Sequence, residues 1–170
     1  MLIKEFSFME ASPLLAFIEK NKDKIVGKEI KRFYSSSLFG GITDDPVVFE
    51  FDEFSLILHY FFYSDITIQI VDPQLVHEDN SLNFLYRGIP ESCNLRQYVN
   101  EIPFPYIDVK IVDITVQRFV EEFEINGATG ETRPEGGDYF KVITVHLEGG
   151  RRFYICGEDA IVDGYMVVWD

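Results

Sequence analysis

The first residues to test for chemistry are the three histidines, His59, His77 and His146. His59 and His146 fall in segments whose apolar residues alternate as in strands, and His77 falls in an irregular stretch. No His-x-His, HExxH or Cys/His spacing of a zinc site is present, so we expect no metal site. An enzyme hypothesis therefore requires His59 or His146 to meet carboxylates that are distant in the sequence. The competing interpretation is that these histidines pack beside aromatic residues or face water.

Carboxylates are abundant, with 29 Asp and Glu residues in 170. Pairs such as Asp44-Asp45 and Glu158-Asp159 lack the alternating ligands, central glycine and closing Glu of a calcium loop. At this density adjacent acids carry little information, and we expect most of them to lie on a solvated surface.

Cysteine and glycine patterns also lack a catalytic or cofactor motif. Cys93 and Cys156 lie far apart and form no CxxC. The glycine-rich stretches Gly127–Arg133 and Gly136–Phe140 do not join a strand to a helix, as phosphate-binding loops do. We therefore expect no cofactor and no enzymatic activity. The N-terminal stretch has no export signal, so the thiols are expected to be reduced and the protein cytoplasmic.

One helix is predicted near the N-terminus. Ser12 can cap it, Pro13 suits its first turn, and Gly27 can end it. Its apolar face is formed by four residues: Leu14, Phe17, Ile18 and Ile25. The helix is therefore expected to pack on a sheet.

The rest of the chain is dominated by period-two alternation, which predicts about eight mostly antiparallel strands. The expected strands are Lys28–Tyr34, Val47–Asp52, Phe54–Phe62, Ile66–Ile70, Ile107–Phe123, Tyr139–Leu147, Arg151–Cys156 and Tyr165–Trp169. The predicted fold is mainly β (α+β by strict count), a barrel or sandwich with one N-terminal helix. Length indicates a single domain, 1–170.

Two segments of the chain, 28–72 and 107–170, show the same order of strands, which is consistent with two repeated four-strand halves. Ile30–Phe33 (IKRF) resembles Val116–Phe119 (VQRF). The alternative is chance, because alternating strands resemble one another. The irregular segment 73–106 is expected to join the halves and to contain a short helix around Asn94–Asn100.

The net charge of −14 restricts the partners. The stretch Phe33–Tyr86 contains nine acidic residues and neither Lys nor Arg. Such a balance repels nucleic acid and anionic lipid. No segment approaches the ~20 apolar residues of a membrane span, so we expect neither nucleic acid nor membrane as a partner.

The leading functional hypothesis is a non-enzymatic, acidic, cytoplasmic protein that binds a basic protein, in the manner of an immunity or inhibitor protein. Charge complementarity would speed such an association. The expected contact residues are Asp44, Asp45, Glu50, Asp52, Glu53 and Asp65. Two alternatives stay open: a β-barrel that binds a small molecule in an aromatic-lined cavity, and an enzyme using strand histidines with carboxylates. Exposed strand edges could also pair two copies as a homodimer.

Overall fold

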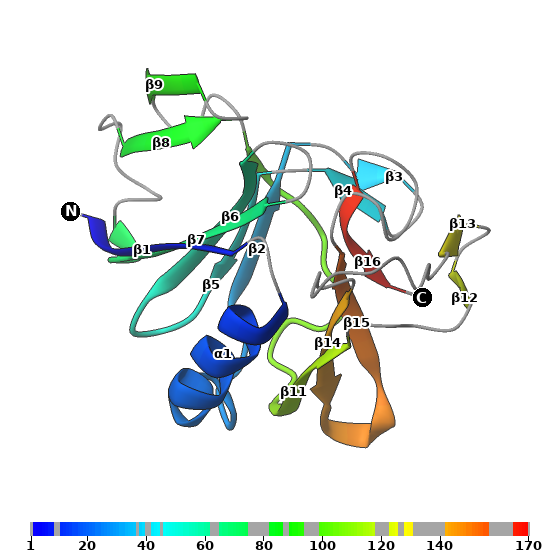
Figure 1. The fold of residues 1–170 in the computed structure, drawn as a ribbon. Coiled ribbons are helices and arrows are strands. Elements are labelled where there is room, and N and C mark those ends of the chain that lie inside the picture. The colour runs from blue at the N-terminus through cyan, green and yellow to red at the C-terminus, as the bar shows by residue number, and fades with distance from the viewer. Residues whose placement is uncertain are drawn as a thin grey trace.

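Two six-stranded antiparallel sheets face each other, and one helix lies beside them (Figure 1). This computed structural model describes residues 2–8, 11–36, 38–39, 42–44, 46–61, 65–74, 82–86, 89–93, 99–117, 123–125, 128–130, 142–156 and 165–169. Within these residues the two sheets are open rather than joined, so the fold is a β-sandwich with a helix.

Each sheet is described by its strands in spatial order. The first sheet contains β1 (Leu2–Phe8), β7 (Asp65–Val71), β6 (Ser55–Phe61), β5 (Val47–Glu50), β2 (Arg32–Ser35) and β10 (Asn100–Glu101). The second contains β11 (Ile111–Gln117), β14 (Val142–Leu147), β15 (Arg152–Cys156), β16 (Tyr165–Trp169), β4 (Ile42–Asp44) and β3 (Leu38–Phe39). Two separate hairpins are β8 (Leu82–Tyr86) with β9 (Ile89–Cys93), and β12 (Phe123–Ile125) with β13 (Ala128–Gly130). A short 3-10 turn, η2 (Glu148–Gly150), links β14 to β15.

The predicted fold class is confirmed: the protein is mainly β, its strand pairs are antiparallel, and the strands form a sandwich. The strands that sequence reasoning missed are mostly short. β3, β4 and β10 have only two or three residues, too few to show alternation. The longer β1 was also missed, since Lys4 and Glu5 interrupt its apolar pattern. The helix expected around Asn94–Asn100 falls largely outside the described residues, and Asn100 itself lies in β10.

The predicted helix is α1 (Ala11–Ile25). The helix begins at Ala11, one residue before Ser12, so Ser12 lies inside the first turn and does not precede the helix as a cap; Pro13 lies in the first turn as predicted. Gly27 has a φ of 88°, a left-handed conformation that favours glycine after a helix. Its N–H donates to the carbonyl oxygen of Ile111 at 2.8 Å, so the end of α1 is joined to β11.

Four consecutive sheet neighbours in each half follow the same antiparallel order, β2-β5-β6-β7 and β11-β14-β15-β16. A short hairpin interrupts each series after its first strand: β3–β4 in one half and β12–β13 in the other. The sheets nevertheless do not coincide with the predicted halves 28–72 and 107–170. β3 and β4 join the second sheet through β16, and β10 from the 73–106 segment joins the first. The duplication itself stays a prediction.

Aromatic rings fill one end of the space between the sheets. Phe104, from the segment between β10 and β11, lies 4.7 Å from Phe33 and 5.3 Å from Phe153 between ring centroids. Phe49 and Trp169 complete the cluster, at 5.1 Å and 6.0 Å from Phe33. All five rings are buried. Many aromatics of the sequence are therefore core, and the connecting segment is part of that core.

Candidate functional site: an apolar cavity between the sheets

An apolar cavity of about 200 Å³ lies between the two sheets and against α1. From α1 it is bordered by Phe17, Ile18 and Ile25. The sheets and their connections supply the other apolar walls: Ile30, Phe49, Phe51, Phe54, Leu56, Leu58, Ile68, Ile70, Ile111, Ile114, Ile143, Val145, Phe153 and Ile155. Among the described lining residues, Asn21 and Lys24 have polar side chains.

Strand pairing makes each of the two walls continuous. Leu58 pairs with Ile68 across β6 and β7, and Ile114 pairs with Val145 across β11 and β14. Paired residues project to the same face of their sheet, so each pair gives a continuous apolar surface. Here the two surfaces face each other, and the space between them is incompletely filled.

The rim of the cavity is marked by the lining residues that solvent still reaches. Lys24 is exposed, and five lining residues are half-buried: Phe17, Ile25, Phe54, Leu56 and Ile70. The deeper walls are almost inaccessible to water. The cavity therefore opens between α1 and the end of the first sheet at which the β5–β6 turn and the last residues of β7 lie.

Helix α1 is fixed over the cavity from both sides. Lys22 forms an ion pair with Asp113 in β11. This contact lowers the pKa of Asp113 and raises the pKa of Lys22, chiefly through the hydrogen bond between them. On the first sheet, the Phe17 ring lies 4.5 Å from Phe6 and 5.1 Å from Phe8 between centroids. The helix thus bridges β1 and β11 and closes one side of the sandwich.

The chemistry of this lining suits binding. Among the described residues that line the cavity there is no carboxylate, histidine, cysteine or hydroxyl side chain, so these residues offer no general base and no nucleophile. A dry apolar cavity of about 150 Å³ is large enough to bind benzene. At about 200 Å³, this cavity has room for a somewhat larger apolar molecule.

The histidines do not converge. His59 lies in β6 on the face away from the cavity and is fully buried. His146 lies in β14 on the outer face of the other sheet, where its Nε2 is 3.0 Å from the hydroxyl of Thr115. His77 lies outside the described residues. The sandwich separates His59 from His146, so these two histidines do not share a site, and the alternative in which either one meets a carboxylate stays a prediction.

Three of the predicted contact acids have described side chains, and their environments differ. Glu50 is only 8% exposed, and the hydroxyl of Tyr34 donates to its Oε2 at 3.3 Å. Glu50 therefore does not lie on the outward surface that the sequence suggested, because β5 is covered on both faces. Asp52 and Glu53 are exposed in the β5–β6 turn, where Glu53 pairs with Lys28 at 2.7 Å.

The other predicted acids are placed only in part. Asp44 and Asp65 lie in β4 and β7, their side chains are outside the described part, and Asp45 is outside it altogether. Among residues whose side chains are described, eleven are acidic and nine are basic. Most of the −14 net charge therefore belongs to residues outside this set.

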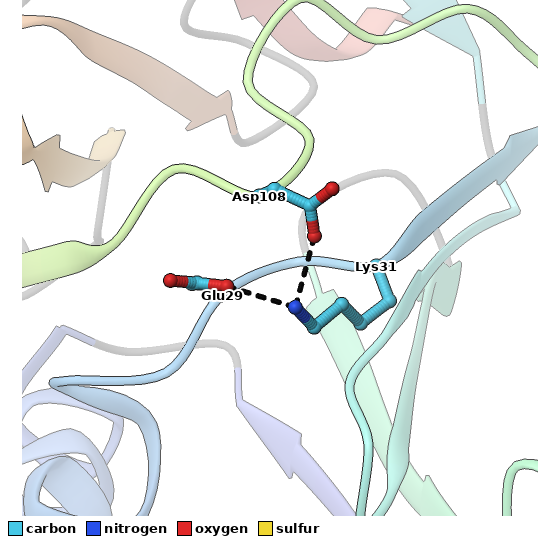
Figure 2. Close-up of polar contacts among 3 residues, drawn as sticks. All are labelled: Glu29, Lys31 and Asp108. Carbon is cyan, nitrogen blue, oxygen red and sulfur yellow. Dashed lines mark hydrogen bonds and ion pairs between the residues drawn. The ribbon is translucent and has the colours of Figure 1, made fainter.

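A second hollow, of about 760 Å³, borders the connection between β10 and β11. Lys31 at its edge is held by Glu29 at 2.8 Å and by Asp108 at 2.9 Å, as Figure 2 shows. These carboxylates raise the pKa of Lys31, mainly through the two hydrogen bonds. Asp108 has a φ of 59°, in the left-handed region that aspartate tolerates better than most residues. This cluster fastens the connection to the strand entry at Lys31, so we assign it a structural role.

No group of three or more His, Cys, Asp or Glu residues suited to a metal ion occurs among the described residues. Within the same part of the chain, no helix combines the length and apolar character needed to cross a membrane. Comparison with models of protein families, with curated proteins and with solved structures finds no match.

Sequence reasoning missed Asn21 and Lys24. Neither residue was among the predicted site residues, yet Asn21 is only 9% exposed. The available signal was its position: Asn21 follows Leu14, Phe17 and Ile18 at the spacing of the apolar face. A polar residue within an apolar stripe marks a place where a helix borders something other than a fully packed core.

Proposed function

We propose that the protein binds a small apolar molecule in the cavity between its sheets, and does so without catalysis. The observation that carries this proposal is the cavity of about 200 Å³ with nearly uniform apolar walls. It corresponds to the small-molecule alternative drawn from the sequence, in a sandwich rather than a barrel. We also propose a cytoplasmic location, because two cysteines that form no CxxC pair favour a reducing compartment.

Energetics favours an occupant. An enclosed core cavity costs about 24 cal/mol for each Å³, so about 5 kcal/mol is the upper limit for about 200 Å³ in a cavity that opens at its rim. The total stability of a folded domain is only about 5–15 kcal/mol. A ligand that fills the space restores the lost contacts and stabilises the folded state by mass action.

The test is an NMR titration with 1-octanol, following the methyl signals of Ile111 and Ile143 in the cavity wall. With about 0.5 kcal/mol for each non-hydrogen atom, we expect a dissociation constant of about 10⁻⁴–10⁻³ M. The matched control is 1,8-octanediol, which has the same chain but must bury a second hydroxyl without a partner. Its affinity is expected to be at least about tenfold lower. Absence of saturable shifts with 1-octanol, or equal affinity for the diol, would contradict the proposal.

A basic protein partner is the second candidate, and the net charge of −14 is the observation that favours it. The exposed acids of the β5–β6 turn, Asp52 and Glu53, are the described residues we assign to this contact. An immunity or inhibitor protein for a basic toxin belongs to this class. The test is co-purification from the native host at low and at physiological salt, with Asp52→Asn/Glu53→Gln as the comparison. If no basic protein is retained at either salt, or the double variant retains it equally, this assignment of the contact fails.

A further inference from the structure

Lys24 differs from Lys22, Lys28 and Lys31 in what its ammonium group contacts. Lys22, Lys28 and Lys31 each pair with a carboxylate of the protein. Lys24 Nζ instead lies 3.3 Å from the neutral amide oxygen of Asn21, and no carboxylate of the described residues pairs with it. A positive charge thus stands at the rim of an apolar cavity without an anion from the described part of the protein.

Asn21 holds this arrangement in place. Its Nδ2 donates to the carbonyl oxygen of Phe17 at 2.7 Å, which fixes the amide and directs Oδ1 toward Lys24. Asparagine is unfavourable inside a helix, and an apolar residue would extend the stripe of α1. The helix dipole accounts for a lysine near the C-terminus of α1 but not for a buried asparagine that orients it. Both residues line the cavity, so a ligand is the simplest common reason for them.

We propose that the ligand is a monocarboxylate with an apolar body of about eight carbon atoms, a proposal that rests on the proposed binding function. Benzene fits a cavity of about 150 Å³, or about 25 Å³ for each carbon, so about 200 Å³ holds about eight carbons. The apolar body lies between Phe153, Leu58 and their neighbours, and the carboxylate lies at the rim against Lys24 Nζ. Proximity to apolar walls lowers the local dielectric constant and strengthens this pair relative to one in open solvent.

The experiment compares octanoate, 1-octanol and octylammonium at about 0.15 M salt, by the same NMR titration, for the wild type and for two variants. Lys24→Met removes the rim charge. Lys20→Met is the matched control, because Lys20 is exposed on the same helix but does not line the cavity. Both variants remove one positive charge. The control therefore measures how the overall charge of the protein affects ligand binding, apart from the position of Lys24.

We expect Lys24→Met to raise the ratio of the octanoate to the octanol dissociation constant about fivefold, the upper end for a partly exposed ion pair. Lys20→Met is expected to leave this ratio unchanged, and octylammonium is expected to be the weakest ligand of the wild type. An unchanged ratio in Lys24→Met, or an equal rise in both variants, overturns the carboxylate proposal. Binding of 1-octanol in the same experiment would still support the proposed function. If none of the three ligands binds, the proposed function fails as well.

Discussion

Filling the cavity from the protein side is the most direct test of its existence. Val145 lines the cavity from β14, whereas Val142 on the same strand is equally buried and does not line it. Replacing either residue with Phe adds four carbon atoms. Val145→Phe places them in the cavity, and Val142→Phe forces them into packed surroundings. The two variants are therefore expected to change stability in opposite directions.

The size of the expected change in the free energy of unfolding follows from the cavity volume. At about 25 Å³ for each carbon, four carbons occupy about 100 Å³, about half of the cavity. At about 24 cal/mol for each Å³ this recovers about 2.4 kcal/mol. Imperfect fit removes about 1 kcal/mol, so Val145→Phe is expected to raise the free energy of unfolding by about 1–2 kcal/mol. Val142→Phe is expected to lower it by about 1–3 kcal/mol.

Urea denaturation provides the measurement, with the fluorescence of the single, buried Trp169 as the signal. With an m value of about 2 kcal/mol/M, the midpoint of Val145→Phe is expected to rise by about 0.5–1 M at unchanged m. The same variant should bind 1-octanol more weakly, since half the space is taken. If Val145→Phe lowers the midpoint as Val142→Phe does, the space beside Val145 is already filled and the cavity argument is wrong.

Three further outcomes concern side chains outside the cavity. Glu50→Ala is expected to destabilise the protein by about 1–3 kcal/mol and Asp52→Ala by less than about 0.5 kcal/mol, because only Glu50 is buried; equal urea midpoints would contradict this. Lys22 lowers the pKa of Asp113 in the folded protein. Their contact therefore stabilises the protein at pH values above the ordinary aspartate pKa, and this contribution is lost as the pH falls through the lowered pKa of the folded state. The wild-type midpoint should therefore fall more than that of Asp113→Asn between about pH 6 and about pH 3, and parallel curves would exclude this linkage. Burial raises the pKa of the Cys156 thiol, so at about pH 8 iodoacetamide should label it, by mass spectrometry, in urea and not in buffer; rapid labelling of the native protein would show that the thiol is accessible.

The larger strands could be predicted because their residues alternate clearly. The hairpin of β14 and β15 and the last strand, β16, lie where the pattern placed them. Alternation identifies the faces of a strand but not what covers them, which is why Glu50 was assigned to the surface. Its neighbours Val48 and Phe49 are both buried, so β5 has no solvated face. Burial on both faces depends on segments from elsewhere in the chain.

The cavity could not be predicted from the sequence. Its wall residues, such as Leu58, Ile68 and Val145, have the same types as residues of a fully packed core. Whether facing side chains meet or leave a space depends on the distance between the sheets, which α1 and the Phe104 cluster help to set. The only local sign was Asn21 within the apolar stripe of α1, and its meaning required the position of Lys24.

The exchange of strands between the sheets has a consequence for how the chain reaches its native state. β4 pairs with β16, about 120 residues further along the chain, so the second sheet cannot be completed until almost the whole sequence is available. Such distant pairings make loop closure costly and folding slow. The first sheet likewise acquires its last strand, β10, only after the β8–β9 hairpin. A fragment of either half would lack an edge strand of its own sheet. During synthesis the early strands would remain unpaired until their partners are made, and other chains could form hydrogen bonds with their exposed backbone.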